Sequence, residues 1–415
     1  MKNVRVYIAL FLVAAITAGL VGCAVSAKAD DLMKDVTPDS VSGKPADAAF
    51  TAGMAGFSVE LFKKSVTAKK NSLISPLSVT LALSMTANGA DNETLKQMEA
   101  LLGGIPIDEL NEYLYSYRTG LASTSKSKLN IANSIWFNNN KELLRVEPDF
   151  LQRNADYYNA SLFGADFSEQ TVKDINDWVK TNTDGMIDAI LKEINDEVLF
   201  LVNAIAFDAE WDTIYKENAI REDIFTNINS EQQTVDLMFS GESIYLEDEM
   251  ATGFVKPYFG GKYSFVALLP KESVLIDEYI ESLTGQRFMD VLENAQDVVV
   301  NAAMPKFEYE YDISMIDTLK ALGVLDAFDI DMADFGKMGS SPKGKLYISE
   351  VLYKTFIKVD AQGTKAGAAT AVIAPAGSAP NRDEPKIVRL DRPFVYAIID
   401  NATNLPIFIG TVMSV

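Results

Sequence analysis

Apolar residues recur every three or four positions in several stretches of this chain, which is the spacing of helices that bury one face. The first predicted helix covers 48–64. A second begins at Ser75, a natural N-cap, with Pro76 in its first turn, and its apolar residues continue to Asn88 on most sides. We therefore expect this second helix to lie inside the body. Further helices are predicted at 93–102, 172–179 and 313–322.

Other stretches have the composition of strands. The longest, 198–207, is apolar on both faces except at Asn203, so it is predicted to be a central strand covered on two sides. Asn203 is then a buried polar group that needs a partner. Shorter strands are predicted at 131–137, 263–269, 298–302, 395–399 and 407–409, and 346–359 is another long extended candidate. Helices and strands interleave without a regular βαβ period, which predicts the α+β class.

One stretch, 363–374, consists almost entirely of small residues and is broken by Pro375. As a strand it places Thr, Ala and Val on one face and its only charge, Lys365, on the other. Such a segment can lie exposed as a loop, or it can enter a sheet without burying a charge. Composition alone favours a flexible Ala/Gly linker, so the pattern leaves both interpretations open.

The N-terminus has the features of an export signal. Lys2 and Arg5 precede an apolar run at 6–19, and a small-residue box ends at Cys23, the only cysteine in the chain. The box resembles that of bacterial lipoproteins, in which this cysteine is lipidated; the alternative is a plain uncleaved anchor. We expect residues 1–22 to be a signal peptide and the protein to be exported and lipid-anchored through Cys23 at the bacterial cell surface or envelope.

The remaining chain divides into a tether and a body. Residues 23–47 are polar and predict a flexible tether with a reach of about 28 Å. Residues 48–415 show no internal repeat or linker, and with 48% hydrophobic residues overall the chain can bury a large core.

Composition restricts the possible chemistry. The chain has no histidine, which excludes a Ser-His-Asp triad, a Cys-His pair and His-ligated metals. Neither a phosphate-binding loop nor a paired-cysteine zinc motif is present. We therefore expect no cofactor, no metal and no enzymatic activity, although a carboxylate pair among 58 acidic residues stays possible.

The chain is acidic, with a formal net charge of −21. Removal of 1–22 would take away Lys2 and Arg5. Such a surface disfavours nucleic acid and anionic lipid as partners, whereas a basic protein would be attracted to it. The alternative is that the charge only keeps the protein soluble.

Motifs spread along the whole body resemble those of the serpin family, over about residues 48–415. Each motif alone is weak, but their order and spacing together are specific. The matching stretches are Asn71 with Ser75-Pro76-Leu77-Ser78; Ala132-Asn133 with Trp136; Ile175-Asn176 with Trp178-Val179 and Thr183; Leu201-Val202-Asn203-Ala204-Ile205 with Phe207 and Trp211; Pro305-Lys306-Phe307; Ala333-Asp334-Phe335; Gly363-Thr364 with Ala366; and Arg392-Pro393-Phe394.

This resemblance implies a monomeric domain of three β-sheets and eight or nine helices, with an exposed reactive-centre loop. In inhibitory serpins a protease cleaves the loop, which inserts into the main sheet and carries the acyl-linked protease with it. The implied hinge consists of Gly363, Thr364, Lys365, Ala366, Gly367, Ala368, Ala369 and Thr370. The implied switch region contains Ser75, Ser78, Asn203 and Tyr353 beneath the sheet, and Trp211 near the top, where ordinary core packing is an equally good explanation.

Three residues depart from the family pattern. Tyr353 stands where many serpins have histidine, and Ala361 replaces a common glutamate, which leaves Lys306 without that possible partner. We hypothesise that these two changes lower the barrier to spontaneous insertion. Lys365 replaces another glutamate and should be tolerated on the solvent face.

The reactive bond can be placed from either end of the loop. Counting from the hinge gives Gly377-Ser378, whereas counting back from Arg392 gives Arg382. Arg382 is disfavoured because insertion that far would place Pro375 and Pro380 inside a central strand. Ala374-Pro375-Ala376 resembles sequences that elastase-like proteases accept, so the predicted bond is Ala376-Gly377, with Gly377-Ser378 as the alternative.

These expectations lead to one main functional hypothesis, a serine protease inhibitor directed against elastase-like enzymes. A non-inhibitory serpin that acts as a binding or chaperone-like protein is the alternative. A carboxylate-dependent hydrolase is a third possibility.

Overall fold

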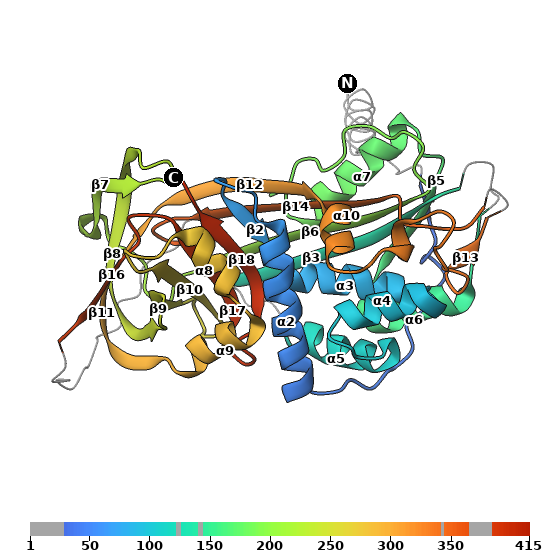
Figure 1. Cartoon of the computed structure of the whole chain (residues 1–415). Coiled ribbons are helices and arrows are strands. Elements are labelled where there is room, and N and C mark those ends of the chain that lie inside the picture. The colour runs from blue at the N-terminus through green and yellow to red at the C-terminus, as the bar shows by residue number, and fades with distance from the viewer. Residues whose placement is uncertain (1–28, 122–125, 140–143, 342–343, 365–383) are drawn as a thin grey trace, which may run out of the picture.

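The computed structural model describes residues 29–121, 126–139, 144–341, 344–364 and 384–415 (Figure 1). Within these ranges the chain forms nine α-helices and three β-sheets, which confirms the expected α+β class and the expected numbers of sheets and helices.

A seven-stranded sheet contains Gly363 and Thr364, the first two residues of the predicted hinge. Its central strand β6 pairs with β3 in antiparallel and with β14 in parallel orientation, so the prediction of a central strand is confirmed. The order across the sheet is β1 (Asp30–Asp31), β5 (Ser161–Ala165), β3 (Ser127–Asn138), β6 (Leu199–Glu210), β15 (Gly363–Thr364), β14 (Glu350–Val359) and β12 (Phe307–Ser314).

A nine-stranded sheet holds the C-terminal part of the chain. Its order is β16 (Lys386–Arg389), β11 (Gln296–Pro305), β8 (Gln232–Glu247), β9 (Ala251–Pro257), β10 (Tyr263–Pro270), β17 (Phe394–Asp400), β18 (Pro406–Val412) and β2 (Ser72–Ile74), with β7 (Ile220–Thr226) paired to β8. The third sheet is the short pair β4 (Arg145–Val146) and β13 (Gly339–Ser340).

Helices cover both faces of the seven-stranded sheet (Figure 1). The helices in the described ranges are α2 (Ala48–Ser65), α3 (Pro76–Ala87), α4 (Asn92–Leu101), α5 (Ile107–Gly120), α6 (Pro148–Tyr158), α7 (Glu169–Asn182), α8 (Ile276–Ser282), α9 (Gly285–Glu293) and α10 (Met315–Ala321). Of these, α8 and α9 contact β17 and β8 of the nine-stranded sheet. Every residue of α3 is buried, and α3 packs on β3, β6 and β18. As predicted, Ser75 is its N-cap, and the Ser75 hydroxyl accepts a hydrogen bond from the Ser78 N–H.

Several predicted boundaries are shifted; the strand expected at 131–137, for example, extends over Ser127–Asn138 as β3. The helix expected at 313–322 begins only at Met315, because Ile313 and Ser314 continue the pairing of β12 with β14. The strand expected at 346–359 begins at Glu350.

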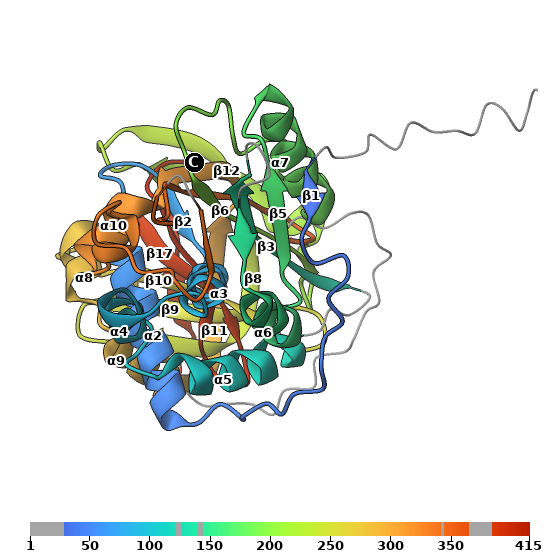
Figure 2. The same cartoon turned by 90° about the vertical axis from the view of Figure 1, so that its right-hand side faces the viewer.

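The expectation of a flexible tether over 23–47 is wrong for residues 29–47. β1 pairs with β5, and Leu32 packs against the core. Lys44 forms an ion pair with Glu109, and the Asp47 side chain caps α2. Figure 2 shows this segment running from β1 past α6 and α5 to α2. This polar segment lacks an apolar face, and strand pairing, ion pairs and a helix cap hold it in place instead.

None of the described helices is long and apolar enough to cross a membrane. The predicted signal peptide and Cys23 lie outside the described residues.

Candidate functional site

The seven-stranded sheet has a distinctive arrangement at its centre. β6 and β14 are direct parallel neighbours over six partner pairs, from Glu350 with Phe200 to Thr355 with Ile205. Above these pairs β15 lies between the two strands and is antiparallel to both, with Thr364 opposite Ala209 on one side and Val359 on the other. A longer strand that continued along the line of β15 would have to separate β6 from β14.

The turn between β14 and β15 is held by the segment that follows β6. Three consecutive carbonyls accept hydrogen bonds: Asp360 O from Trp211 Nε1 at 2.9 Å, Ala361 O from Tyr215 N at 2.8 Å, and Gln362 O from Trp211 N at 2.8 Å. The Asp360 carboxylate closes the turn by accepting the N–H groups of Gln362 and Gly363. We call residues 360–364 together with Trp211, Tyr215 and Tyr258 the hinge anchor.

Side chains complete the hinge anchor. Thr364 is buried, and its Oγ1 lies 2.5 Å from the Tyr258 hydroxyl. The Tyr258 ring stacks on Trp211 with 4.5 Å between centroids. Trp211 thus belongs to a packed aromatic cluster, and its indole N–H also binds the turn that precedes β15.

Gly363 is required by the close approach of β15 to β6. A Cβ atom at this position would lie 2.0 Å from the carbonyl oxygen of Ala209 and 2.9 Å from the Cα atom of Glu210. A side chain at 363 would therefore push β15 away from β6.

A second polar cluster lies beneath the sheet and brings together the other predicted switch residues. Tyr353 accepts a hydrogen bond from Ser75 N at 2.5 Å, which links β14 to the start of α3. Ser78 Oγ and Asn203 Nδ2 both donate to Asn133 Oδ1, at 3.3 and 2.9 Å. These residues connect β3, β6, β14 and α3 at the level where β6 and β14 still touch.

Asn133 belongs to this cluster but was not among the predicted site residues. It pairs with Asn203 across β3 and β6, and its Nδ2 donates to the Ser78 carbonyl. The available signal was the match of Ala132-Asn133 to the family motif. The Oδ1 atom of Asn203 is buried without a hydrogen-bond partner among the described residues, so the cluster is incompletely satisfied.

Tyr353 fills the position where a histidine was expected. Burial raises the pKa of Tyr353 well above its ordinary value, so the phenol is neutral. Its hydroxyl accepts the hydrogen bond of the buried Ser75 N–H. The replacement of histidine by tyrosine therefore leaves this N–H paired.

Ala361 leaves Lys306 without a glutamate partner at that position, but Lys306 has another partner. Its Nζ lies 2.8 Å from Asp236 Oδ2, and its backbone N–H donates to the Asp236 carbonyl. Both side chains are partly exposed, so this ion pair contributes about 0–1 kcal/mol. Asp236, on β8, is therefore the ion-pair partner of Lys306.

The other predicted functional residues lie outside the described residues. These are the hinge residues Lys365, Ala366, Gly367, Ala368, Ala369 and Thr370, the reactive-bond residues Ala376, Gly377 and Ser378, and the lipidation residue Cys23.

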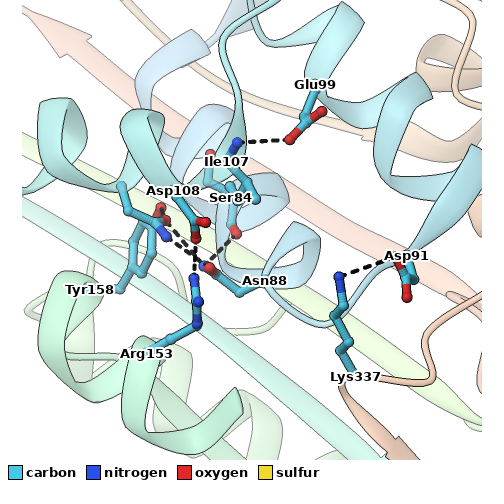
Figure 3. A network of polar contacts seen from close by, with 10 residues as sticks. Ser84, Asn88, Asp91, Glu99, Ile107, Asp108, Arg153, Tyr158 and Lys337 are labelled. Atoms are coloured by element: carbon cyan, nitrogen blue, oxygen red, sulfur yellow. Dashed lines mark hydrogen bonds and ion pairs between the residues drawn. The ribbon is translucent and has the colours of Figure 1, made fainter. Parts of the chain in front are cut away.

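A different polar region lies at the other end of the helical layer, in a pocket of about 560 Å³ beside α4, α5 and α6. Figure 3 shows that its polar groups bind one another: Arg153 pairs with Asp108, Lys337 with Asp91, and Asn88 donates to the Ser84 carbonyl. The Arg153 pair joins α6 to α5, the Lys337 pair holds the segment before β13 to the N-cap of α4, and the Asn88 bond closes the C-terminal turn of α3. In the described ranges no group of three or more metal-ligating side chains is close enough to hold an ion.

Comparison with known proteins assigns the family. The family model described as serpin (serine protease inhibitor) matches residues 52–415. The chain is a serpin. It is 30% identical to the leukocyte elastase inhibitor of Xenopus tropicalis, in an alignment that covers 85% of this chain and 96% of that protein.

Two solved structures of the thermophilic serpin tengpin are also similar to this serpin. The native state is 55% identical, with a TM-score of 0.89, and the match covers 93% of this chain and all of that one. The latent state is 52% identical, with a TM-score of 0.80, covering 90% of this chain and all of that one. The three-sheet serpin fold expected from the motifs is confirmed.

Proposed function

We propose that this serpin inhibits elastase-like serine proteases by a suicide-substrate mechanism. The observation that carries the proposal is the position of β15, which already lies between β6 and β14 and is antiparallel to both. The sequence that follows has small, uncharged residues on one face, so it can extend this strand without burying a charge.

The reaction begins as ordinary proteolysis. The protease serine attacks the carbonyl carbon of Ala376, the peptide bond to Gly377 breaks, and the proton from the serine is passed by the protease's own base to the departing amine. The products are an acyl-enzyme ester on Ala376 and a new amino terminus at Gly377. Insertion of the loop before hydrolysis of this ester carries the protease away from its docking position.

Insertion exchanges one parallel ladder for two antiparallel ones. The six partner pairs between β6 and β14 are lost, and each strand gains the inserted strand as its neighbour. About ten new ladder hydrogen bonds form, each worth roughly 1 kcal/mol net. Their total is on the order of 10 kcal/mol before the loss of the pairs between β6 and β14 is subtracted. Parallel pairs are slightly less stable per residue than antiparallel ones, so the exchange favours insertion.

Specificity for elastase-like enzymes rests on Ala374-Pro375-Ala376 and is supported by the similarity to a leukocyte elastase inhibitor. The test is to mix the protein with an elastase and look for a complex that survives a denaturing gel. The matched variant Ala376→Arg should form this complex with a trypsin-like protease instead. Mass spectrometry of the released fragment distinguishes Ala376-Gly377 from Gly377-Ser378.

Two outcomes would contradict inhibition. Cleavage without a covalent complex would make the protein a substrate only. If loop cleavage also left Tm unchanged, no strand would have been inserted, and a non-inhibitory binding or chaperone-like role would be favoured.

We further propose that the protein is anchored through a lipidated Cys23. β1 begins at Asp30, so at most seven residues separate the lipid from the edge of the seven-stranded sheet. Fully extended, they span about 25 Å. The variant Cys23→Ser should be found in the soluble fraction of the producing bacterium, whereas the unchanged protein should incorporate labelled fatty acid and sediment with membranes.

A further inference from the structure

A buried ion pair lies next to the hinge anchor. Lys256, on β9, places its Nζ 2.9 Å from Oε1 of Glu242, on β8, and the side chains are only 2% and 8% exposed. The same Oε1 atom accepts a hydrogen bond from Ser240 at 2.6 Å. Removal of two charges from water costs several kcal/mol per ion, so a buried pair by itself is weak evidence for a stabilising role.

The ammonium also contacts two aromatic rings of the hinge anchor. Lys256 Nζ lies 4.4 Å from the ring centroid of Tyr215 and 5.4 Å from that of Trp211, both within cation–π range. In a site this buried such contacts are worth more than at an exposed one. Glu242 fixes the ammonium, and the ammonium in turn restrains both rings.

These two aromatic residues supply all three N–H groups that bind the hinge carbonyls. Trp211 uses its backbone and indole N–H groups, and Tyr215 its backbone N–H. Restraint of the two residues therefore restrains the turn at 360–362. This turn fixes β15 in register, with Gly363 opposite Glu210 and Thr364 opposite Ala209.

We propose that Lys256 is a positioning residue that holds Trp211 and Tyr215 so that β15 stays in register as the first rung of the inserting strand. A one-residue slip would turn the small-residue face of the loop to the wrong side of the sheet. Insertion must occur before the acyl-enzyme hydrolyses, so a preformed first rung increases the fraction of protease that is trapped. The inference rests on the proposed inhibitory function.

The principal variant replaces both charges, Lys256→Met with Glu242→Gln. This combination leaves no unpaired buried charge, and Gln keeps an oxygen that can accept from Ser240. The pair borders a pocket of about 240 Å³ that is also lined by Tyr215 and Phe239, so there is room for small adjustments.

The first measurement is amide hydrogen exchange in the intact protein, which needs no protease. We expect the amides of Trp211 and Tyr215 to exchange about tenfold faster in the double variant, while amides of β10 and β17 keep their rates. Unchanged exchange at Trp211 and Tyr215 would overturn the proposal. If the double variant does not fold, Tyr215→Leu, which removes one of the two ring contacts, must show the same loss at Trp211.

A matched control is available at Arg287 and Asp248. This pair is also close, at 2.8 Å, and the Arg287 guanidinium lies over the ring of Tyr279, but in the described ranges neither side chain forms a hydrogen bond, ion pair or ring contact with the hinge anchor. Arg287→Met with Asp248→Asn should leave exchange at Trp211 and Tyr215 unchanged. An equal increase in this control would reduce the effect to general loosening and contradict the proposal.

The second measurement separates positioning from binding. The double variant should need about twice as much inhibitor per protease molecule, with an unchanged association rate, because only the competition between insertion and hydrolysis is altered. Lys256→Arg, which keeps a cation over the rings, should restore both readouts. If the unchanged protein forms no covalent complex, the proposed function fails, whereas the exchange experiment still decides the role of Lys256.

Discussion

At the scale of single residues, the site depends on a few positions where a larger side chain would not fit or where a buried hydrogen-bonding group has only one partner or none. Gly363 has no space for a Cβ atom, and Tyr353 is the acceptor for a buried N–H that begins α3. The buried Oδ1 atom of Asn203 has no hydrogen-bond partner in the part of the chain that the structure describes. Each position makes a distinct mutational prediction, because steric, hydrogen-bonding and desolvation effects differ in sign and size.

Gly363→Ala should destabilise the protein by about 1–3 kcal/mol, since the added methyl group would overlap the Ala209 carbonyl and displace β15. Denaturant unfolding measures the difference. Gly56→Ala, in α2, is the matched control: a Cβ there meets nothing within 4 Å, so Ala should stabilise by about 0.5–1 kcal/mol through helix propensity. Equal stability of Gly363→Ala and the unchanged protein would contradict the close approach.

Tyr353→Phe should lower the free energy of unfolding by about 1–3 kcal/mol, because it leaves the Ser75 N–H buried without an acceptor. Tyr347→Phe, nearby in the sequence, removes a hydroxyl that makes no hydrogen bond to the described residues, and it should change stability little. Conversion to an inserted form on heating should be faster for Tyr353→Phe than for Tyr347→Phe. Identical behaviour of the two variants would mean that this hydrogen bond does not hold β14 to α3.

At the scale of elements, the sequence predicted those whose pattern is long and self-consistent. The buried helix α3 was identified from Ser75, Pro76 and its apolar residues, and β6 from ten nearly continuous apolar positions. β1 and β15 have two residues each, too few for any periodicity. For β1 the strand conformation comes from pairing with β5, which single-chain patterns cannot reveal. β15 begins the stretch 363–374, for which the pattern left a strand and a linker open, and its pairing with β6 and β14 makes Gly363–Thr364 a strand.

A partly buried glutamate, Glu350, lies at the start of the pairing between β6 and β14. Burial, and to a lesser extent the charges of Glu197 and Asp317, raises the pKa of Glu350, the first residue of β14. A raised carboxyl pKa means that the folded state binds the proton more tightly than the unfolded state. Its stabilising contribution is therefore present at low pH and is lost as pH rises through the folded-state pKa.

Glu350→Gln should accordingly raise Tm at pH 7 by about 1–2 °C, since Gln is uncharged and keeps an acceptor for the Val351 N–H. The difference should shrink as pH falls through the raised folded-state pKa of Glu350, and it should be gone below the ordinary value of about 4.5, where the carboxyl is protonated in both states. Thermal unfolding over a pH series measures this. Glu193→Gln, at an exposed position, is the control, and a pH-independent difference for Glu350→Gln would refute the explanation.

At the scale of the whole molecule, the family and the fold could be inferred from the sequence, because motifs of known order fix the topology. The structure also brings four of the predicted switch residues together in the polar cluster beneath the sheet. The Lys256 and Glu242 pair could not, since the two residues are 14 positions apart on neighbouring strands and neither belongs to a recognised motif. Asp236 as the partner of Lys306 was missed for the same reason. Contacts between strands depend on the pairing register, which cannot be determined from the sequence of one chain.

The net charge of −21 belongs to this scale as well. A protease with a basic surface should associate faster at low than at high ionic strength, because salt screens the attraction over a distance of about 10 Å at 0.1 M. An acidic protease that accepts the same loop should show the opposite trend. Association rates measured by stopped flow over a salt series test this, and a flat response for both proteases would show that the charge serves only solubility.

The two ends of the segment between Thr364 and Glu384 are held by different sheets. β15 belongs to the seven-stranded sheet, whereas β16 pairs with β11 in the nine-stranded one. Every residue of β17 and β18, which follow β16, is buried. A protein cut at Ala376 should therefore continue as a two-chain molecule of unchanged mass in native conditions. Its short C-terminal chain would be released only by unfolding, so gel filtration would not register the event that a denaturing gel reveals.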